Sequence, residues 1–223
     1  LTGYRESTAR QDQLFAYDTA TYAALTQTLL GDVESAEGWL ERAKQHRYSQ
    51  PAAWLSATVG TSGRLAAALI AMDQLDRDAT DRAIAELGDL DRPDELWSLM
   101  LHVSVRYALL WGDPEEQLEQ LERLARIRTS HAALAPPGSL ADNLLIADLS
   151  DLLMATGQGT RAHQMLADLP IEHAAMTVRR ARLALLRGDA KGAILLASKI
   201  AWNDTTSARS RLGALPLLAL AME

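Results

Sequence analysis

An eight-residue segment occurs twice in this chain with little change. It reads RYALLWGD over residues 106–113 and RLALLRGD over residues 182–189. The closing Gly-Asp pair also stands at residues 31–32, and looser counterparts stand at 75–76 and 157–158. These marks lie about 31 to 45 residues apart, which is the period of helical-hairpin arrays. The repeat therefore favours a fold built from similar units over a single irregular core.

The apolar residues around the marks have helical spacing. Helices before the marks are apolar on more than one face, which is typical of a helix between two neighbours. After each mark, apolar residues recur at i, i+3, i+4 and i+7; they are Ala36, Trp39, Leu40 and Ala43, then Leu118, Leu121, Leu124 and Ala125, then Ala162, Met165, Leu166 and Leu169, and finally Ala193, Leu196, Ala197 and Ile200.

We therefore predict an all-α fold without a sheet. About eleven helices should pair antiparallel into a solenoid of about five hairpins plus a terminal helix, each hairpin burying its face against the next. Turns are expected at Gly31, near Leu75, and at Gly112, Gly157 and Gly188. Prolines stand where helices should begin or loops should run, at Pro51, Pro93, Pro114, Pro136 and Pro137.

Composition limits where this chain works and what it binds. It has no cysteine, so disulfides and thiolate sites are excluded and a reducing cytoplasm is expected. Its net charge is −7, so it lacks the basic surface that duplex DNA requires. The most apolar tract, residues 212–222, is shorter than the ~18 residues of a membrane helix and contains Pro216. We expect neither direct nucleic-acid binding nor a membrane span.

The domain organisation is predicted as one helical-repeat domain over residues 14–223. Residues 1–13 form a lead-in that is either helical or disordered. The chain does not begin with Met, and residues 205–223 look like the first helix of a further hairpin. These two features indicate a piece of a longer protein.

No motif in the chain specifies a reaction. The run from Gly157 to Ala162 fits the dinucleotide pattern G-x-G-x-x-A, but a helix enters it where that motif requires a strand, so we interpret it as a turn. There is no phosphate loop. The histidines lack metal-site spacing; they are His46, His102, His131, His163 and His173. We expect no catalytic residues, no cofactor and no metal, and therefore no enzyme.

Two unusual features have a structural and a functional interpretation. Gly60 and Gly63 fall inside an expected helix over residues 51–72, where each glycine costs up to about 1 kcal/mol. They predict either a close helix crossing or local break, or a polar notch for a ligand. Trp39 and Trp202 follow the apolar stripes and are predicted core residues. Trp54, Trp97 and Trp111 lie on or near first helices and are the tryptophans considered for a ligand surface.

The repeats resemble the tetratricopeptide pattern. The spacing of Gly31, Ala36 and Ala43, repeated at Gly188, Ala193 and Ile200, is similar to that of its small residues, although the first-helix Trp-Leu-Gly-Tyr residues are missing. A narrower resemblance, over residues 18–223, is to the helical-repeat region of large ATP-binding LuxR-type transcription regulators, the MalT-like family. Those proteins carry runs similar to RYALLWGDPEEQLEQLERL and RARLALLRGDAKGAILLA.

This resemblance implies a non-catalytic sensor domain. It would bind a small-molecule inducer or a regulatory protein and control adjacent ATPase and DNA-binding domains, with self-association as an option. In tetratricopeptide-like superhelices the first helices line a concave groove, which places five residues in a predicted ligand or partner surface: Trp97, His102, Arg106, Asp151 and Arg182. Two arginines and an aspartate along a groove suit an anionic or hydroxyl-rich ligand or a peptide. The alternative is a free-standing scaffold that binds a peptide or protein.

Overall fold

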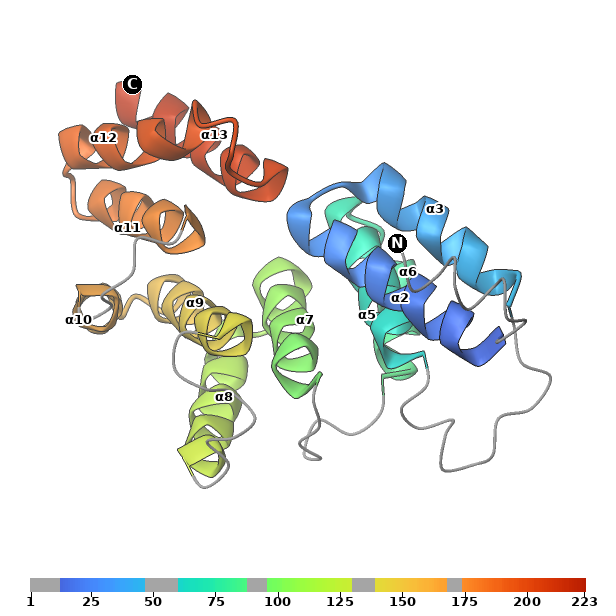
Figure 1. Cartoon of the computed structure of the whole chain (residues 1–223). Helices are drawn as coiled ribbons and strands as arrows, with labels where there is room; N and C mark the ends of the chain where they lie inside the picture. The colour runs from blue at the N-terminus through green and yellow to red at the C-terminus, as the bar shows by residue number, and fades with distance from the viewer. Residues whose placement is uncertain (1–12, 47–59, 88–95, 130–138, 168–173) are drawn as a thin grey trace. The chain divides into compact units, whose positions relative to one another are not determined.

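The described part of the chain is entirely helical. The computed structural model describes residues 13–46, 60–87, 96–129, 139–167 and 174–223 (Figure 1). Within these ranges there is no strand, and the helices are α2 (Gln13–Leu30), α3 (Val33–Lys44), α5 (Thr61–Asp73), α6 (Arg77–Ala85), α7 (Trp97–Trp111), α8 (Pro114–Thr129), α9 (Leu140–Ala155), α10 (Gly159–Ala167), α11 (Ala174–Leu186), α12 (Ala190–Ala201) and α13 (Ala208–Met222). The all-α prediction is confirmed.

The chain divides into two compact units, Leu1–Val103 and Ser104–Glu223, with the boundary inside α7. In the first unit α2 packs against α3 and α5, and α5 packs against α6. In the second unit α9 contacts α8, α10 and α11, while α11 also contacts α10, α12 and α13. The prediction of a single domain over residues 14–223 stays a prediction. The lead-in before Gln13, together with Trp54, Pro51, Pro93, Pro136 and Pro137, lies outside the described residues.

Helices end at each of the five predicted corners. Four corners share one backbone motif, in which a residue with positive φ donates its N–H to the carbonyl three residues earlier and the next residue donates to the carbonyl five residues earlier. These bonds satisfy the last carbonyls of the helix, as in the Schellman motif. The residues with positive φ are Gly31 (85°), Leu75 (57°), Gly157 (75°) and Gly188 (78°).

The aspartate of the Gly-Asp pair begins the next helix. The Asp32 carboxylate accepts the N–H of Ser35 at 3.1 Å, and Asp76 and Asp189 cap α6 and α12 in the same way. The hydrogen bonds from Ser35 hold the pKa of Asp32 below its ordinary value. A glycine that ends one helix and an aspartate that starts the next explain why this pair recurs at the predicted period.

The corner at Gly112 is built differently. The N–H of Gly112 donates to the carbonyl of Ala108, so α-type bonding continues to the end of α7. Asp113 then accepts the N–H groups of Glu115 and Glu116. Pro114 occupies the first helical position of α8, where its missing N–H costs nothing. The two copies of the eight-residue repeat therefore share a turn position and a cap but not a backbone conformation.

Leu75 is the only described residue other than glycine with a positive φ, and its replacement by glycine should stabilise the protein. Leu75 is 68% exposed, so little apolar burial is lost, while relief of left-handed strain outweighs the added freedom of the unfolded chain. We expect Leu75→Gly to raise the free energy of unfolding by about 0.5–1 kcal/mol in urea titrations. The matched control, Gly157→Ala, should lower it by about 1 kcal/mol. A loss of stability in Leu75→Gly would contradict this account.

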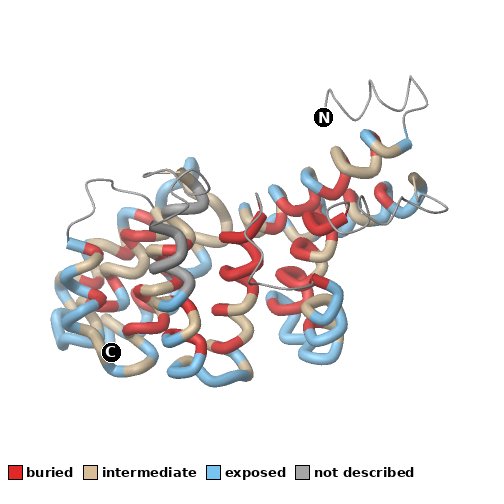
Figure 2. Tube along the Cα trace, turned by 90° about the horizontal axis from the view of Figure 1, so that it is seen from below, coloured by how far each residue is buried: buried red, intermediate tan, exposed pale blue. Residues whose placement is uncertain are grey.

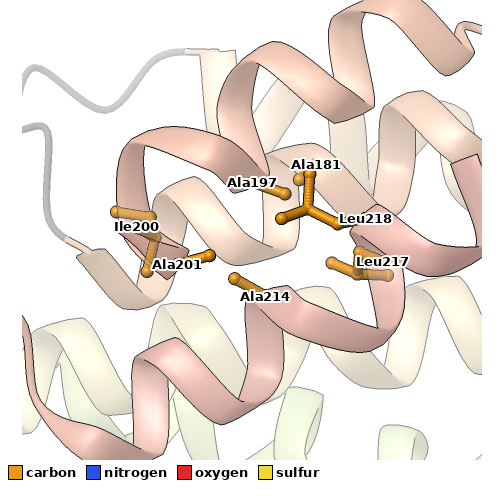
Figure 3. Close-up of a cluster of buried hydrophobic side chains, with 7 residues drawn as sticks. All are labelled: Ala181, Ala197, Ile200, Ala201, Ala214, Leu217 and Leu218. Carbon is orange, nitrogen blue, oxygen red and sulfur yellow. The ribbon is translucent and has the colours of Figure 1, made fainter. Parts of the chain in front are cut away.

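Small side chains let the helices approach closely. Ala16, Ala20 and Ala24 form a stripe along α2 that is fully buried, as is Ala36 on α3. In the second unit, Figure 3 shows the corresponding cluster from α11, α12 and α13, which consists of Ala181, Ala197, Ile200, Ala201, Ala214, Leu217 and Leu218. Exposed residues gather at the corners, and buried residues lie along the helices (Figure 2). Alanine suits such contacts because it loses no side-chain entropy in a helix.

Gly60 and Gly63 mark the start of a helix and a close helix crossing. Gly60 has φ +89° and precedes α5, which begins at Thr61. A Cβ atom on Gly63 would lie 2.9 Å from Cγ2 of Thr21 on α2. Beside this crossing, Ser62 Oγ donates to Thr21 Oγ1 at 2.8 Å, and the pair is buried. The close helix crossing is therefore confirmed, and residues 51–59 of the expected helix lie outside the described residues.

The tryptophans divide into buried and exposed. Trp39 is 7% exposed and lies under the guanidinium of Arg42, whose Cζ is 4.5 Å from the ring centroid, so its core assignment is confirmed. The core assignment of Trp202 is wrong, because its side chain is 74% exposed. Position 202 follows Ala193 by nine residues, which at 3.6 residues per turn places it about 180° from the buried stripe of α12. It also stands at the C-cap, just beyond Ala201.

Candidate ligand surface on the first helices

Three charged side chains meet between α9 and α11. Asp151 lies on α9, and Arg179 and Arg182 lie three residues apart on α11, so both can face the same neighbour. Asp151 Oδ2 is 2.6 Å from Nη2 of Arg179, and Asp151 Oδ1 is 3.5 Å from Nη1 of Arg182. Both carboxylate oxygens of Asp151 are therefore engaged by guanidinium groups.

The two arginines have different roles. The side chain of Arg179 is 17% exposed and also donates to the carbonyls of Ala147 and Ala175, each at 3.1 Å. The Arg182 side chain is 54% exposed and makes the longer contact with Asp151. A short, partly desolvated pair is much stronger than a long exposed one. Arg179 therefore fixes Asp151 in place, whereas Arg182 can exchange its partner at little cost.

Sequence reasoning missed Arg179. In the eight-residue repeat Arg182 is equivalent to Arg106, and this equivalence is what selected the two arginines as candidate site residues. By the same equivalence, the residue that corresponds to Arg179 is Val103. The first copy therefore has no arginine one turn before Arg106, and the repeat does not single out Arg179. The spacing of Arg179 and Arg182 on one helix face was the available signal.

Of the five predicted residues, the structure brings Asp151 and Arg182 into contact. Arg106 lies on α7 with its side chain at intermediate exposure. Trp97 and His102 are only 3% and 8% exposed, and they belong to the first unit, whereas the other three belong to the second. In this structure Trp97 and His102 contribute to packing. Their assignment to a ligand surface stays a prediction.

Three further findings concern metal binding, membrane spans and similarity to known proteins. No group of three or more histidine, aspartate or glutamate side chains there could hold a metal ion. None of the described helices combines the length and apolar character needed to cross a bilayer. Comparison of the chain with family models, curated proteins and solved structures finds no match. The resemblance to MalT-like regulators therefore rests on the residues quoted for it.

Proposed function

We propose that this chain is a non-catalytic, tetratricopeptide-like repeat domain that binds an effector and regulates a LuxR-type, ATP-dependent transcription regulator. The supporting observation is the recurring corner, in which one residue pair closes a helix and caps the next. A chain that repeats such hairpins buries each unit against its neighbour and displays a long surface of first helices. Such surfaces are suited to binding.

Within this proposal, Arg182 is the residue that contacts the effector. Its side chain is more than half exposed, and Nη1 lies 3.5 Å from Asp151, so an anionic group can replace that contact. Arg179 keeps Asp151 oriented during the exchange, because it bonds the carboxylate and two backbone carbonyls. The effector is therefore an anionic or hydroxyl-rich small molecule, or the acidic segment of a regulatory protein.

The test is genetic complementation with a transcriptome readout. Deleting the gene should change a defined set of transcripts, and the wild-type gene should restore them. The Arg182→Gln gene should not restore them, because loss of a central anchor of about 2 kcal/mol weakens effector binding roughly 30-fold. The matched control is Lys199→Gln, an exposed cation on α12, which should restore them. An unchanged transcriptome after deletion would overturn the regulatory role and favour the free-standing scaffold.

A further inference from the structure

A cavity of about 430 Å³ lies between α10, α11 and α12 in the second unit. Its described lining comprises His163, Leu166, Ala167, Arg180, Leu183, Ala184, Arg187, Asp189 and Leu196. None of the three residues of the Asp151 contact takes part in it. Its volume lies within the roughly 300–1,000 Å³ of small-molecule pockets. The cavity is therefore a second candidate site, distinct from the proposed effector surface.

The described lining of the cavity carries more positive than negative charge, opposite in sign to the chain as a whole. Two arginines line it against one aspartate, whereas the chain carries −7. The carboxylate of Asp189 is already engaged, since it accepts the N–H of Gly192 at 2.9 Å and caps α12. A local excess of positive charge on an acidic protein favours an anionic ligand.

The two arginines differ in the contacts that hold them. Arg180 donates through Nε and Nη2 to the carbonyl of Leu166, at 3.2 and 2.7 Å, which holds its guanidinium against the end of α10. Arg187 is exposed and makes no ion pair with another described residue. Arg180 thus supplies a fixed positive charge, and Arg187 is available to close on an anion with a bidentate contact.

The remaining wall is apolar. Leu166 and Leu183 lie at its buried base, 1% and 3% exposed, and the more exposed Ala167, Ala184 and Leu196 bring apolar surface to the cavity. An inorganic anion alone would leave the exposed part of this wall in water, whereas a ligand with a short hydrocarbon part would cover it.

We propose that this cavity binds a small organic anion, a carboxylate or phosphate monoester that carries a short aliphatic group. Arg187 and His163 contact the anionic group, Arg180 supports it electrostatically, and Ala167, Ala184 and Leu196 cover the aliphatic part. The site goes beyond the proposed function, because it uses different side chains from the Asp151 contact.

Titration calorimetry on the purified chain tests this proposal with octanoate, octyl phosphate, inorganic phosphate and octylamine. At least one octyl anion should bind saturably at millimolar concentration, and octylamine and inorganic phosphate should bind at least about tenfold more weakly. Arg187→Gln should weaken the octyl anion about tenfold or more, since it removes a charge-assisted contact. Circular dichroism should confirm that this variant is folded, as expected for an exposed residue.

The matched control is Arg182→Gln, which removes an exposed arginine of α11 that lies outside the cavity. It should leave octyl-anion binding unchanged even if it abolishes the transcriptional response, which separates the two proposals. Absence of saturable binding by both octyl anions, equal binding of octylamine, or an equal loss in the two arginine variants would overturn the site. Preference for octanoate or for octyl phosphate identifies which anionic group it takes.

Discussion

Replacing Asp151 with Ala should lower the free energy of unfolding by about 2–3 kcal/mol. The Asp151 and Arg179 side chains are 13% and 17% exposed and lie 2.6 Å apart, so the substitution leaves a largely desolvated guanidinium without its carboxylate. The loss should appear as a lower urea midpoint in denaturation followed by circular dichroism. Arg182→Ala is the control, since that side chain is 54% exposed, and it should cost less than about 1 kcal/mol.

A double variant distinguishes the free-energy cost of leaving Arg179 unpaired from the net stabilisation that the Asp151–Arg179 ion pair provides. Asp151→Leu with Arg179→Met replaces both partners with apolar side chains. Because a desolvated ion pair is often matched by apolar residues of similar volume, this variant should recover most of the stability lost in Asp151→Ala. Equal losses in the Asp151 and Arg182 single variants would show that the exposed contact carries as much energy as the buried one, contrary to our interpretation.

Replacing Gly63 with Ala should destabilise the crossing of α2 and α5. The new methyl group would lie 2.9 Å from Cγ2 of Thr21, and Thr21 is only 1% exposed, so it has little room to move. Overpacking of this kind costs about 1–3 kcal/mol, while alanine returns up to about 1 kcal/mol of helix propensity. We expect a net loss of about 1–2 kcal/mol in urea titrations.

The substitution Thr21→Ser should rescue the stability lost in Gly63→Ala. Serine removes the clashing Cγ2 but keeps the hydroxyl that Ser62 bonds at 2.8 Å. In the Thr21→Ser background, Gly63→Ala should therefore be neutral or stabilising, and the double-mutant cycle should give a coupling of about 1–3 kcal/mol. Additive losses would show that the two positions are not in contact.

Features that depend on neighbouring residues could be predicted from the sequence, whereas features that depend on contacts between distant residues could not. The corners were predictable because a positive φ and a helix cap constrain the residue that occupies them. Gly63 was recognisable as an anomaly, but its partner Thr21 lies 42 positions away and could not be named. Arg179 was missed for the same reason, since its contact with Asp151 depends on how α9 and α11 cross.

The two-residue corners also limit how this protein can change length. The corners at Gly31-Asp32 and Gly188-Asp189 each end one helix and cap the next within a single residue pair. One added residue in the first turn of the following helix would rotate the rest of that helix by about 100°. Buried alanines such as Ala36 and Ala193 would then turn away from their neighbours. Insertions and deletions in homologous genes should therefore fall between hairpins and spare the corners, so that an alignment would show the Gly-Asp pairs at constant distance from the alanines that follow them.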